Sequence, residues 1–236
     1  MKGQTLRSSV ITIPRFDRIP FLKHGFGDRT WQARDFKRSG DWDGFHPLFL
    51  KQIHSDVVHF IAETPQQGLR GDALVTRLPG LLLVIKTADC LPVLLVDVKT
   101  RVIAAVHCGW KGTRLRVLEK TIRGMLERYS VEPGSLLAAL GPCIGAGCYE
   151  VGEDVRDLYA AGGFPGSLFN PIPGRPGKHL FDIRAAARLQ LFGLGIKAKN
   201  IFAVDVCTHC DPAYPSYRRD KKDCGRMLSF IGLSPP

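Results

Sequence analysis

The chain has 236 residues, of which 44% are hydrophobic and 23% charged, a balance typical of a globular protein with one large core. No run approaches the ~18 consecutive apolar residues of a membrane-spanning helix, so we predict no membrane association. The formal net charge of +11 raises nucleic acid as a partner, but the Lys and Arg residues are spread along the chain. We therefore predict no nucleic-acid partner and a basic surface that favours small anionic substrates.

The sequence also indicates a cellular compartment. Residues 8–14, Ser-Ser-Val-Ile-Thr-Ile-Pro, are too short and too polar for the core of a signal peptide. The seven cysteines are an odd number in a chain too long to need disulfides, and such thiols are typical of a reducing environment. We predict a cytoplasmic protein.

The first sixty residues contain two candidate site residues. We expect a strand at 9–14, irregular structure at 24–48 and a second strand at 52–60. Arg29 lies in the irregular part beside two glycines, where it is either a surface arginine or an anion-binding one. In a strand, His54 and His59 would face opposite sides, so only one of them can join a site.

The centre of the chain predicts a buried β-hairpin. Residues 71–86 supply two strands around Pro79-Gly80, and the apolar runs 93–96 and 102–106 follow with a polar turn between them. If the loop has two or four residues, directly opposed residues of the two strands have numbers that add up to 197. Cys90 then faces His107. Opposed Cβ atoms lie roughly 4.5–5.5 Å apart, close enough for both side chains to bind one Zn²⁺. A three-residue loop would instead place them on opposite faces.

The segment after this hairpin has features of an anion site. Residues 109–113, Gly-Trp-Lys-Gly-Thr, precede a helix predicted to run to Tyr129, which would bring backbone N–H groups and Lys111 near His107. The same pattern is equally typical of an ordinary helix start. Arg218 is a further candidate for binding an anion. Asp89, next to Cys90, is either an orienting residue for the metal site or an exposed acid at a strand end.

The remaining elements complete an α/β chain without a linker or repeat. We expect strands at 136–140 and 200–206 and helices at about 152–160 and 182–194. Cys143 and Cys148 have no matching second pair, so we interpret them as reduced thiols near the core. The Cys207-Thr-His-Cys210 segment resembles a redox motif, but it follows a strand and stops at Asp211-Pro212 instead of opening a helix, which disfavours a dithiol function.

Together these segments resemble a known family, the YfiH-like proteins, long labelled "laccase domain" or multicopper polyphenol oxidase. The motifs that carry the resemblance are Gln52-Ile-His54, Gly71-Asp-Ala-Leu-Val-Thr76, Thr87-Ala-Asp-Cys90, His107-Cys-Gly-Trp-Lys-Gly112, Gly141-Pro-Cys-Ile-Gly145, Cys148-Tyr-Glu-Val151, Cys207-Thr, Ser216-Tyr-Arg-Arg219 and Gly225-Arg226. The resemblance implies a single domain over residues 1–236 with a layered α-β-β-α sandwich of mixed sheets.

The resemblance also implies a function. In the family, the residues matching His54, Cys90 and His107 bind one zinc, and members are implicated in purine nucleoside phosphorolysis and adenosine deamination. Nucleosides and phosphate would then be the substrates. The chain departs from the family at Cys108, where a small residue is usual, and at Arg29-Thr-Trp-Gln, where Arg-x-Gly-Gly is expected. The second departure leaves open which residues hold ribose or phosphate.

The old laccase label conflicts with the histidine content. A multicopper oxidase needs about ten histidines, several as His-x-His, in imidazole-rich sites. This chain has seven and no His-x-His, so we expect one zinc per chain and no copper cluster. Two alternatives stay open: a Cys90–His107 dyad that hydrolyses or deamidates an amide, and an accessory role in cell-wall editing. The sequence does not indicate the oligomeric state.

Overall fold

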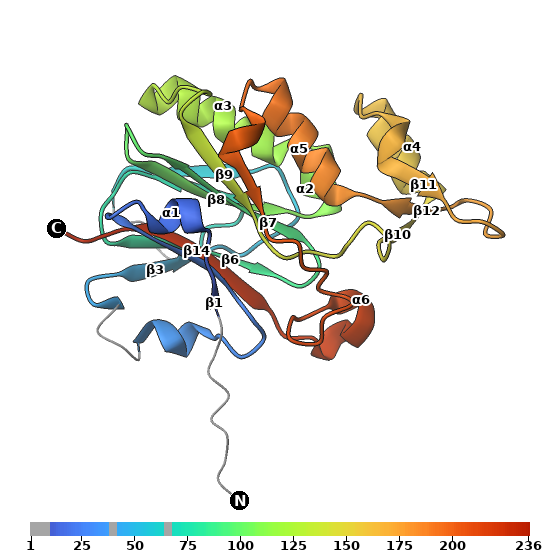
Figure 1. The fold of residues 1–236 in the computed structure, drawn as a ribbon, viewed down its shortest axis with the longest axis horizontal. Helices are drawn as coiled ribbons and strands as arrows, with labels where there is room; N and C mark the ends of the chain where they lie inside the picture. The colour runs from blue at the N-terminus through green and yellow to red at the C-terminus, as the bar shows by residue number, and fades with distance from the viewer. Residues whose placement is uncertain (1–9, 38–41, 64–67) are drawn as a thin grey trace, which may run out of the picture.

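The computed structural model describes residues 10–37, 42–63 and 68–236, and two stacked β-sheets form its centre (Figure 1). The larger sheet has six strands in the order β13-β9-β7-β8-β5-β4. Their bounds are β4 Val58–Ile61, β5 Ala73–Thr76, β7 Leu91–Asp97, β8 Val102–Cys108, β9 Leu136–Leu140 and β13 Ile201–Ala203. Every residue of β7 and β8 is buried, as expected for near-continuous apolar strands covered on both faces.

The second sheet has five strands in the order β1-β2-β14-β6-β3. They are β1 Val10–Ile11, β2 Leu22–Gly27, β3 His46–Phe49, β6 Leu81–Thr87 and β14 Met227–Leu233. The strand β14, from the end of the chain, lies between β2 and β6. Apolar side chains from both sheets fill the space between them, among them Phe26, Leu83, Leu94, Ile103 and Ile231.

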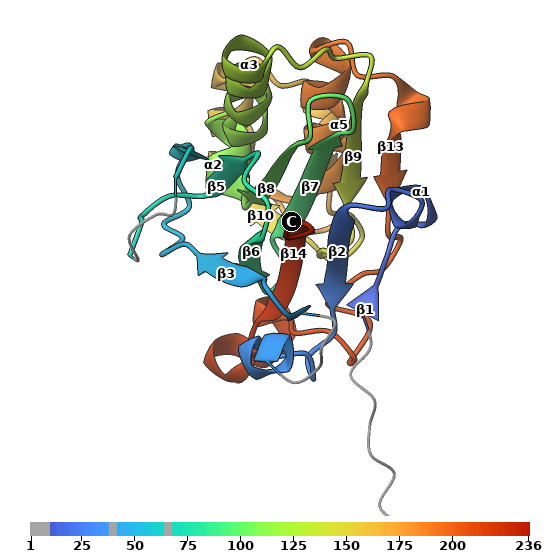
Figure 2. The same ribbon diagram turned by 90° about the vertical axis from the view of Figure 1, so that its left-hand side faces the viewer.

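Helices cover the outer face of the six-stranded sheet, as the two views show (Figures 1 and 2). They are α2 Trp110–Arg114, α3 Val117–Tyr129 and α5 Ile183–Gly193. The apolar face of α3 is buried on the sheet through Val117, Leu118, Ile122 and Met125. The helix α4 Glu153–Ala161 packs against a third sheet of β10 Glu150–Gly152, β12 Lys178–Phe181 and β11 Phe169–Pro171.

The outer face of the five-stranded sheet carries a thinner layer. Here the 3-10 helix η1 Ala33–Lys37 packs its Phe36 on Phe230, together with Trp31 and Trp42. The other short elements are α1 Pro14–Asp17, η3 Gly166–Leu168, η4 Ala198–Asn200, α6 Tyr217–Asp220 and η5 Lys221–Asp223. The expectation of a layered α/β fold with mixed sheets is confirmed. In the ranges that the structure describes, no helix is long and apolar enough to cross a membrane.

The central hairpin is antiparallel as predicted, but its predicted register is wrong. The structure pairs Asp97 with Val102 and Pro92 with His107, so opposed numbers sum to 199. The loop is residues 98–101, because Asp97 Oδ2 accepts hydrogen bonds from Thr100 N at 2.8 Å and Thr100 Oγ1 at 2.6 Å. Arg101 closes the loop with a φ of 54°. A shift of two residues keeps every side chain on its expected face.

Other predicted boundaries also move. The strands β2 and β3 occupy the two ends of the segment 24–48, which was expected to be irregular, and the strand expected at 200–206 ends at Ala203. Residue 9 lies outside the described ranges, and the first strand gives way to α1 at Pro14, whose fixed φ suits a first helical turn. The segment 52–57 is a loop instead of a strand, and β4 begins only at Val58. The predicted helix through Tyr129 is two helices, because Arg116 adopts a left-handed φ of 64° between them.

Candidate metal centre

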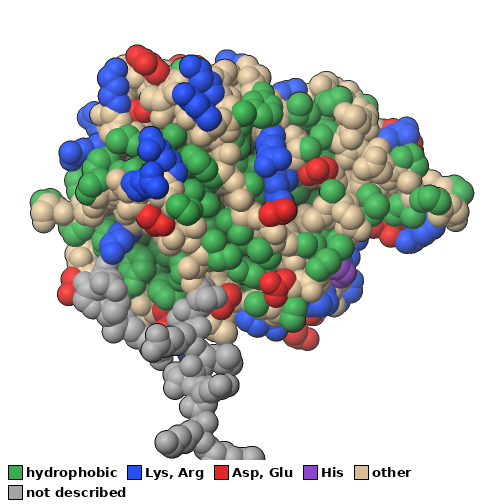
Figure 3. All heavy atoms as spheres, in the orientation of Figure 1, with side chains coloured by type: hydrophobic (Ala, Val, Ile, Leu, Met, Phe, Trp, Pro, Cys, Tyr) green, Lys and Arg blue, Asp and Glu red, His purple; other side chains and the backbone are tan. Residues whose placement is uncertain are grey.

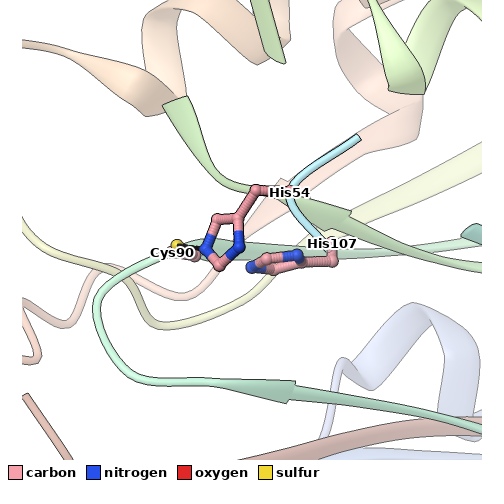
Figure 4. Close-up of side chains that lie close together, drawn as sticks. All are labelled: His54, Cys90 and His107. Carbon is pink, nitrogen blue, oxygen red and sulfur yellow. Dashed lines mark hydrogen bonds between the residues drawn. The ribbon is translucent and has the colours of Figure 1, made fainter. Parts of the chain in front are cut away.

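Three side chains from distant parts of the chain converge at one end of the hairpin (Figure 4). His54 lies in the loop before β4, Cys90 in the turn between β6 and β7, and His107 near the end of β8. One ligand atom from each lies within 4.8 Å of the others, and Cys90 Sγ is 3.9 Å from His54 Nε2. The expected convergence of Cys90 and His107 therefore occurs although the two residues are not opposed in the ladder.

A buried carboxylate that the sequence analysis did not assign organises two of these ligands. Asp72 is fully buried before β5, and its Oδ1 accepts a hydrogen bond from His107 Nδ1 at 2.7 Å. It also accepts from the backbone N–H of His54 at 3.0 Å and from Ser55 N and Oγ at 2.6 and 2.7 Å. Burial disfavours the carboxylate, but the hydrogen bonds from His107 and Ser55 outweigh it and lower the pKa of Asp72 to about 2.

This bond leaves Nε2 of His107 free for a metal. A carboxylate on the far ring nitrogen is the usual partner of a metal-binding histidine, because it fixes the tautomer and the ring orientation. The sequence contained one sign of this role, an acid between Gly71 and an apolar strand, but only the fold brings that acid to His107.

Gly109 leaves room for the three side chains of the cluster. A Cβ at this position would lie 3.0 Å from His54 Cδ2 and 3.1 Å from Cys90 Sγ.

The protonation states of Cys90 and His107 depend on each other. Burial disfavours the Cys90 thiolate, but the charge of His107 and hydrogen bonds from both histidines outweigh it and lower the pKa of Cys90 to about 6. Burial also disfavours protonated His107, yet the thiolate and Asp72 raise the pKa of His107 to about 9. Each partner therefore favours the charged form of the other, and a cation that binds here must displace any proton on the His107 nitrogen that binds it.

The cluster lies in the wall of a pocket of about 760 Å³. Aromatic and cationic side chains line the same pocket, among them Trp110, Tyr149, Tyr217, Lys86, Arg218 and Arg226. A volume of this size with convergent polar groups is typical of a small-molecule site.

The structure brings only one of the three candidate anion-binding residues into this pocket. Arg218 lines it and donates from Nη2 to the Glu150 carbonyl oxygen at 2.8 Å. Arg29 lies outside the lining and pairs with Asp220 at 3.1 Å. Lys111 is exposed on α2, also outside the lining, and its ammonium lies 5.5 Å from the Trp110 ring.

Asp89 is not an exposed acid at a strand end, which was one of the two interpretations of this residue. The side chain is buried, its Oδ1 accepts from Thr208 Oγ1 at 2.7 Å, and its Oδ2 accepts from Arg218 N at 2.6 Å. It therefore joins the Cys90 turn to the C-terminal part of the chain. His59 does not belong to the cluster, and its Nε2 lies 2.9 Å from the Arg70 carbonyl oxygen.

Comparison with known proteins identifies the family. The model of the family described as "Multi-copper polyphenol oxidoreductase laccase" matches residues 33–234. The chain belongs to this family. Among the family's curated relatives, "Purine nucleoside phosphorylase YfiH" of Shigella flexneri is 38% identical over 188 residues, 79% of this chain and 74% of that protein. A purine nucleoside phosphorylase of Pseudomonas aeruginosa is 34% identical over 231 residues, 97% of this chain and 91% of that protein.

Solved structures of the family show the same fold. The hypothetical protein YfiH of Bacillus licheniformis superposes with a TM-score of 0.86 at 25% identity, over 95% of this chain and 96% of that one. YlmD of Geobacillus stearothermophilus gives a TM-score of 0.82 at 26% identity, over 98% of both chains. The resemblance inferred from the motifs is therefore confirmed.

Proposed function

We propose that this chain is a zinc-dependent purine nucleoside enzyme that cleaves adenosine and inosine with phosphate and deaminates adenosine with water. The observation that carries the proposal is the convergence of His54, Cys90 and His107 in the wall of a pocket large enough for a nucleoside. The names of the curated relatives support phosphorolysis, and the family resemblance suggests deamination.

The donor set fits one zinc. Two imidazoles and a thiolate leave a fourth tetrahedral position open, which is the arrangement of catalytic zinc sites. A His₂Cys set also suits a single electron-transfer copper, but oxidation of phenols needs further imidazole-rich copper sites. In the part of the chain that the structure describes, the only other group of three possible ligands consists of cysteines. We therefore favour zinc, one ion in this cluster.

The residues of the chain have distinct parts in this reaction. Bound zinc would supply a Lewis acid that lowers the pKa of water toward 7. Asp72 holds His107 in its binding tautomer, and the rings of Trp110 and Tyr149 offer flat surfaces for a purine base. Arg218 is the candidate for phosphate, because it alone among the three predicted anion-binding residues lies in the pocket.

The two reactions make different demands on the pocket. In phosphorolysis a phosphate oxygen bonds to ribose C1′ while the bond from C1′ to the base breaks, and the base takes a proton as it leaves. In deamination water adds at C6 of adenosine and ammonia leaves. We place both reactions in the same pocket.

We also propose a cytoplasmic location for the protein, because its free thiols stay reduced there.

A second candidate function rests on the same geometry. Cys90, His107 and Asp72 have the order of a thiol, a base and an orienting acid, as in hydrolases with a cysteine nucleophile. Stoichiometric zinc in protein purified without added metal favours the nucleoside enzyme, because a zinc-bound thiolate is a poor nucleophile. Rapid alkylation of Cys90 in the native protein favours the hydrolase. A cell-wall accessory role would show zinc binding without turnover of any nucleoside.

The test is product analysis with adenosine and inosine, each with and without phosphate. The proposal predicts ribose 1-phosphate and free base only when phosphate is present, and inosine and ammonia from adenosine without it. Absence of every product from zinc-loaded wild-type protein would contradict it.

A further inference from the structure

A second group of possible metal ligands lies outside the proposed catalytic cluster. Cys148 ends the glycine-rich loop after β9, and Cys207 and Cys210 follow β13. Their three sulfur atoms lie within 4.8 Å of one another, and Cys148 Sγ is 3.4 Å from Cys210 Sγ. A backbone bridge between Cys143 and Cys207 brings the two segments side by side.

This arrangement suits a metal bound by thiolates. Zinc–sulfur bonds of about 2.3 Å in a tetrahedral site place two sulfurs on the order of 3.8 Å apart, close to the separations found here. Cys207 and Cys210 have the Cys-x-x-Cys spacing common to such sites. The Cys143 thiol is not part of the group and instead accepts a hydrogen bond from Arg184 Nη2 at 3.6 Å.

A backbone N–H group fixes the position of the Cys207 sulfur. Gly145 N donates a hydrogen bond to Cys207 Sγ at 3.1 Å. Hydrogen bonds of this kind neutralise part of the charge on a sulfur ligand and fix its position. One sulfur is therefore held for a ligand before any ligand binds.

We propose that Cys148, Cys207 and Cys210 form a second metal site, which takes a thiophilic d¹⁰ cation, Zn²⁺ or Cu⁺. Soft thiolate ligands select these two ions. Three protein ligands and the exposure of Cys210 leave the cation accessible to solvent, so it exchanges more readily than an ion in a closed four-cysteine site. The site adds a second ion to the one zinc expected from the sequence, and it does not depend on the proposed function.

A disulfide between Cys148 and Cys210 is the alternative to metal binding by these thiols. A disulfide would need an oxidant, and it would leave Cys207 and its hydrogen bond from Gly145 N without a role. A cation uses all three sulfurs, so the geometry favours metal.

The site would position one wall of the pocket. Cys148 directly precedes Tyr149, which lines the pocket, and Cys207 directly precedes Thr208, whose hydroxyl donates to Asp89 beside Cys90. A cation here would tie together two segments that are separated by about sixty positions in the sequence. Its loss should raise hydrogen exchange in residues 144–150 and 205–210 while the sheets stay protected.

The metal count of anaerobically purified, reduced protein tests the proposal. After saturation with Zn²⁺ or, separately, Cu⁺ and removal of excess, native mass spectrometry should find two ions per wild-type chain with at least one of the two metals. Cys148→Ser and Cys210→Ser should each keep one ion, His107→Ala should keep the other, and the His107→Ala/Cys210→Ser double variant should keep none. Cys224→Ser is the matched control, because this buried cysteine belongs to neither group, and it should keep two.

Wild-type protein alone gives a second readout if a variant fails to fold. Co²⁺ added to the protein should produce sulfur-to-cobalt absorption in two successive phases, and the thiols of Cys148, Cys207 and Cys210 should resist alkylation while metal is bound. A single ion per chain that disappears in His107→Ala would overturn the proposal. So would a mass lower by two hydrogens with Cys148 and Cys210 joined in a peptide map, or full alkylation of all three thiols at saturating metal.

Discussion

Asp72 and His107 are joined by a 2.7 Å hydrogen bond between Oδ1 and Nδ1, and the same carboxylate holds the backbone of the loop that carries His54. One fully buried residue thus positions two of the three proposed ligands. On the face shown in Figure 3, Lys and Arg side chains are interspersed with acidic ones instead of gathered in one patch.

The first prediction concerns this carboxylate. Asp72→Asn should weaken zinc binding roughly 10–100-fold, because an amide replaces the charge that orients His107 and accepts fewer of the four close hydrogen bonds. Competition with a chelator of known affinity measures the change. Asp97→Asn is the control, since it alters a fully buried acid at the other end of β7 whose hydrogen bonds go to Thr100 and Ser135. Its zinc affinity should stay within a factor of two or three of wild type, roughly the noise expected between independent sites. Equal losses in both variants would contradict the role of Asp72.

The second prediction concerns Gly109. Gly109→Ala should lower zinc affinity about tenfold, or ~1.4 kcal/mol, because the new methyl group would lie 3.0 Å from His54 Cδ2 and 3.1 Å from Cys90 Sγ. Gly134→Ala is the control, since a Cβ there meets nothing within 4 Å. Chelator competition on both variants gives the answer, and unchanged affinity in Gly109→Ala would show that the cluster has more room than the structure indicates.

The third prediction concerns pH and His24. Its Nε2 accepts a hydrogen bond from Ile13 N at 2.8 Å, which requires the neutral ring, and burial lowers its pKa to about 4 despite nearby Asp17. The unfolded chain, with a pKa near 6.5, binds more protons between these values, so stability falls as pH drops from about 6.5 to about 4. The loss attributable to His24 is about 3 kcal/mol.

Urea unfolding at pH 7 and pH 4.5 measures this loss. His24→Gln keeps an acceptor for Ile13 N but cannot titrate, so its stability should change less over the same pH interval. An identical pH dependence in wild type and His24→Gln would rule out His24 as the source.

The fourth prediction separates the anion-binding candidates. Arg218→Ala should raise the KM for phosphate about tenfold, because it removes a cation from the pocket wall. Lys111→Ala should change this KM less, since Lys111 is exposed on α2 and outside the lining. Steady-state kinetics with inosine and varied phosphate measures both, and a larger effect at Lys111 would favour the expectation drawn from the sequence.

Local patterns in the sequence predicted part of this structure well. The continuous apolar runs, in which polar and apolar residues do not alternate, predicted buried strands. The short turn between them required β7 and β8 to be antiparallel. The register depended on details that the runs do not encode, namely the Asp97 side chain that closes a four-residue loop and the left-handed Arg101. The helix break at Arg116 is of the same kind.

Long-range neighbours were harder to predict than local structure. Cys90 and His107 lie close in sequence, so a hairpin model brought them together despite its wrong register. Asp72 reaches His107 only through the pairing of β5 with β8, and Cys148 reaches Cys210 only through the parallel alignment of β9 and β13. A single sequence contains no signal for such contacts until the strand order is known.

The most direct test of the proposed function is phosphate-dependent formation of ribose 1-phosphate from inosine, measured together with zinc content in wild type and His107→Ala. Zinc-loaded wild type should form the product only with phosphate. His107→Ala should lose the zinc of the His54–Cys90–His107 cluster and all turnover while circular dichroism shows an intact fold, because a chain of this length has a core independent of the site. Full turnover by His107→Ala would contradict the account.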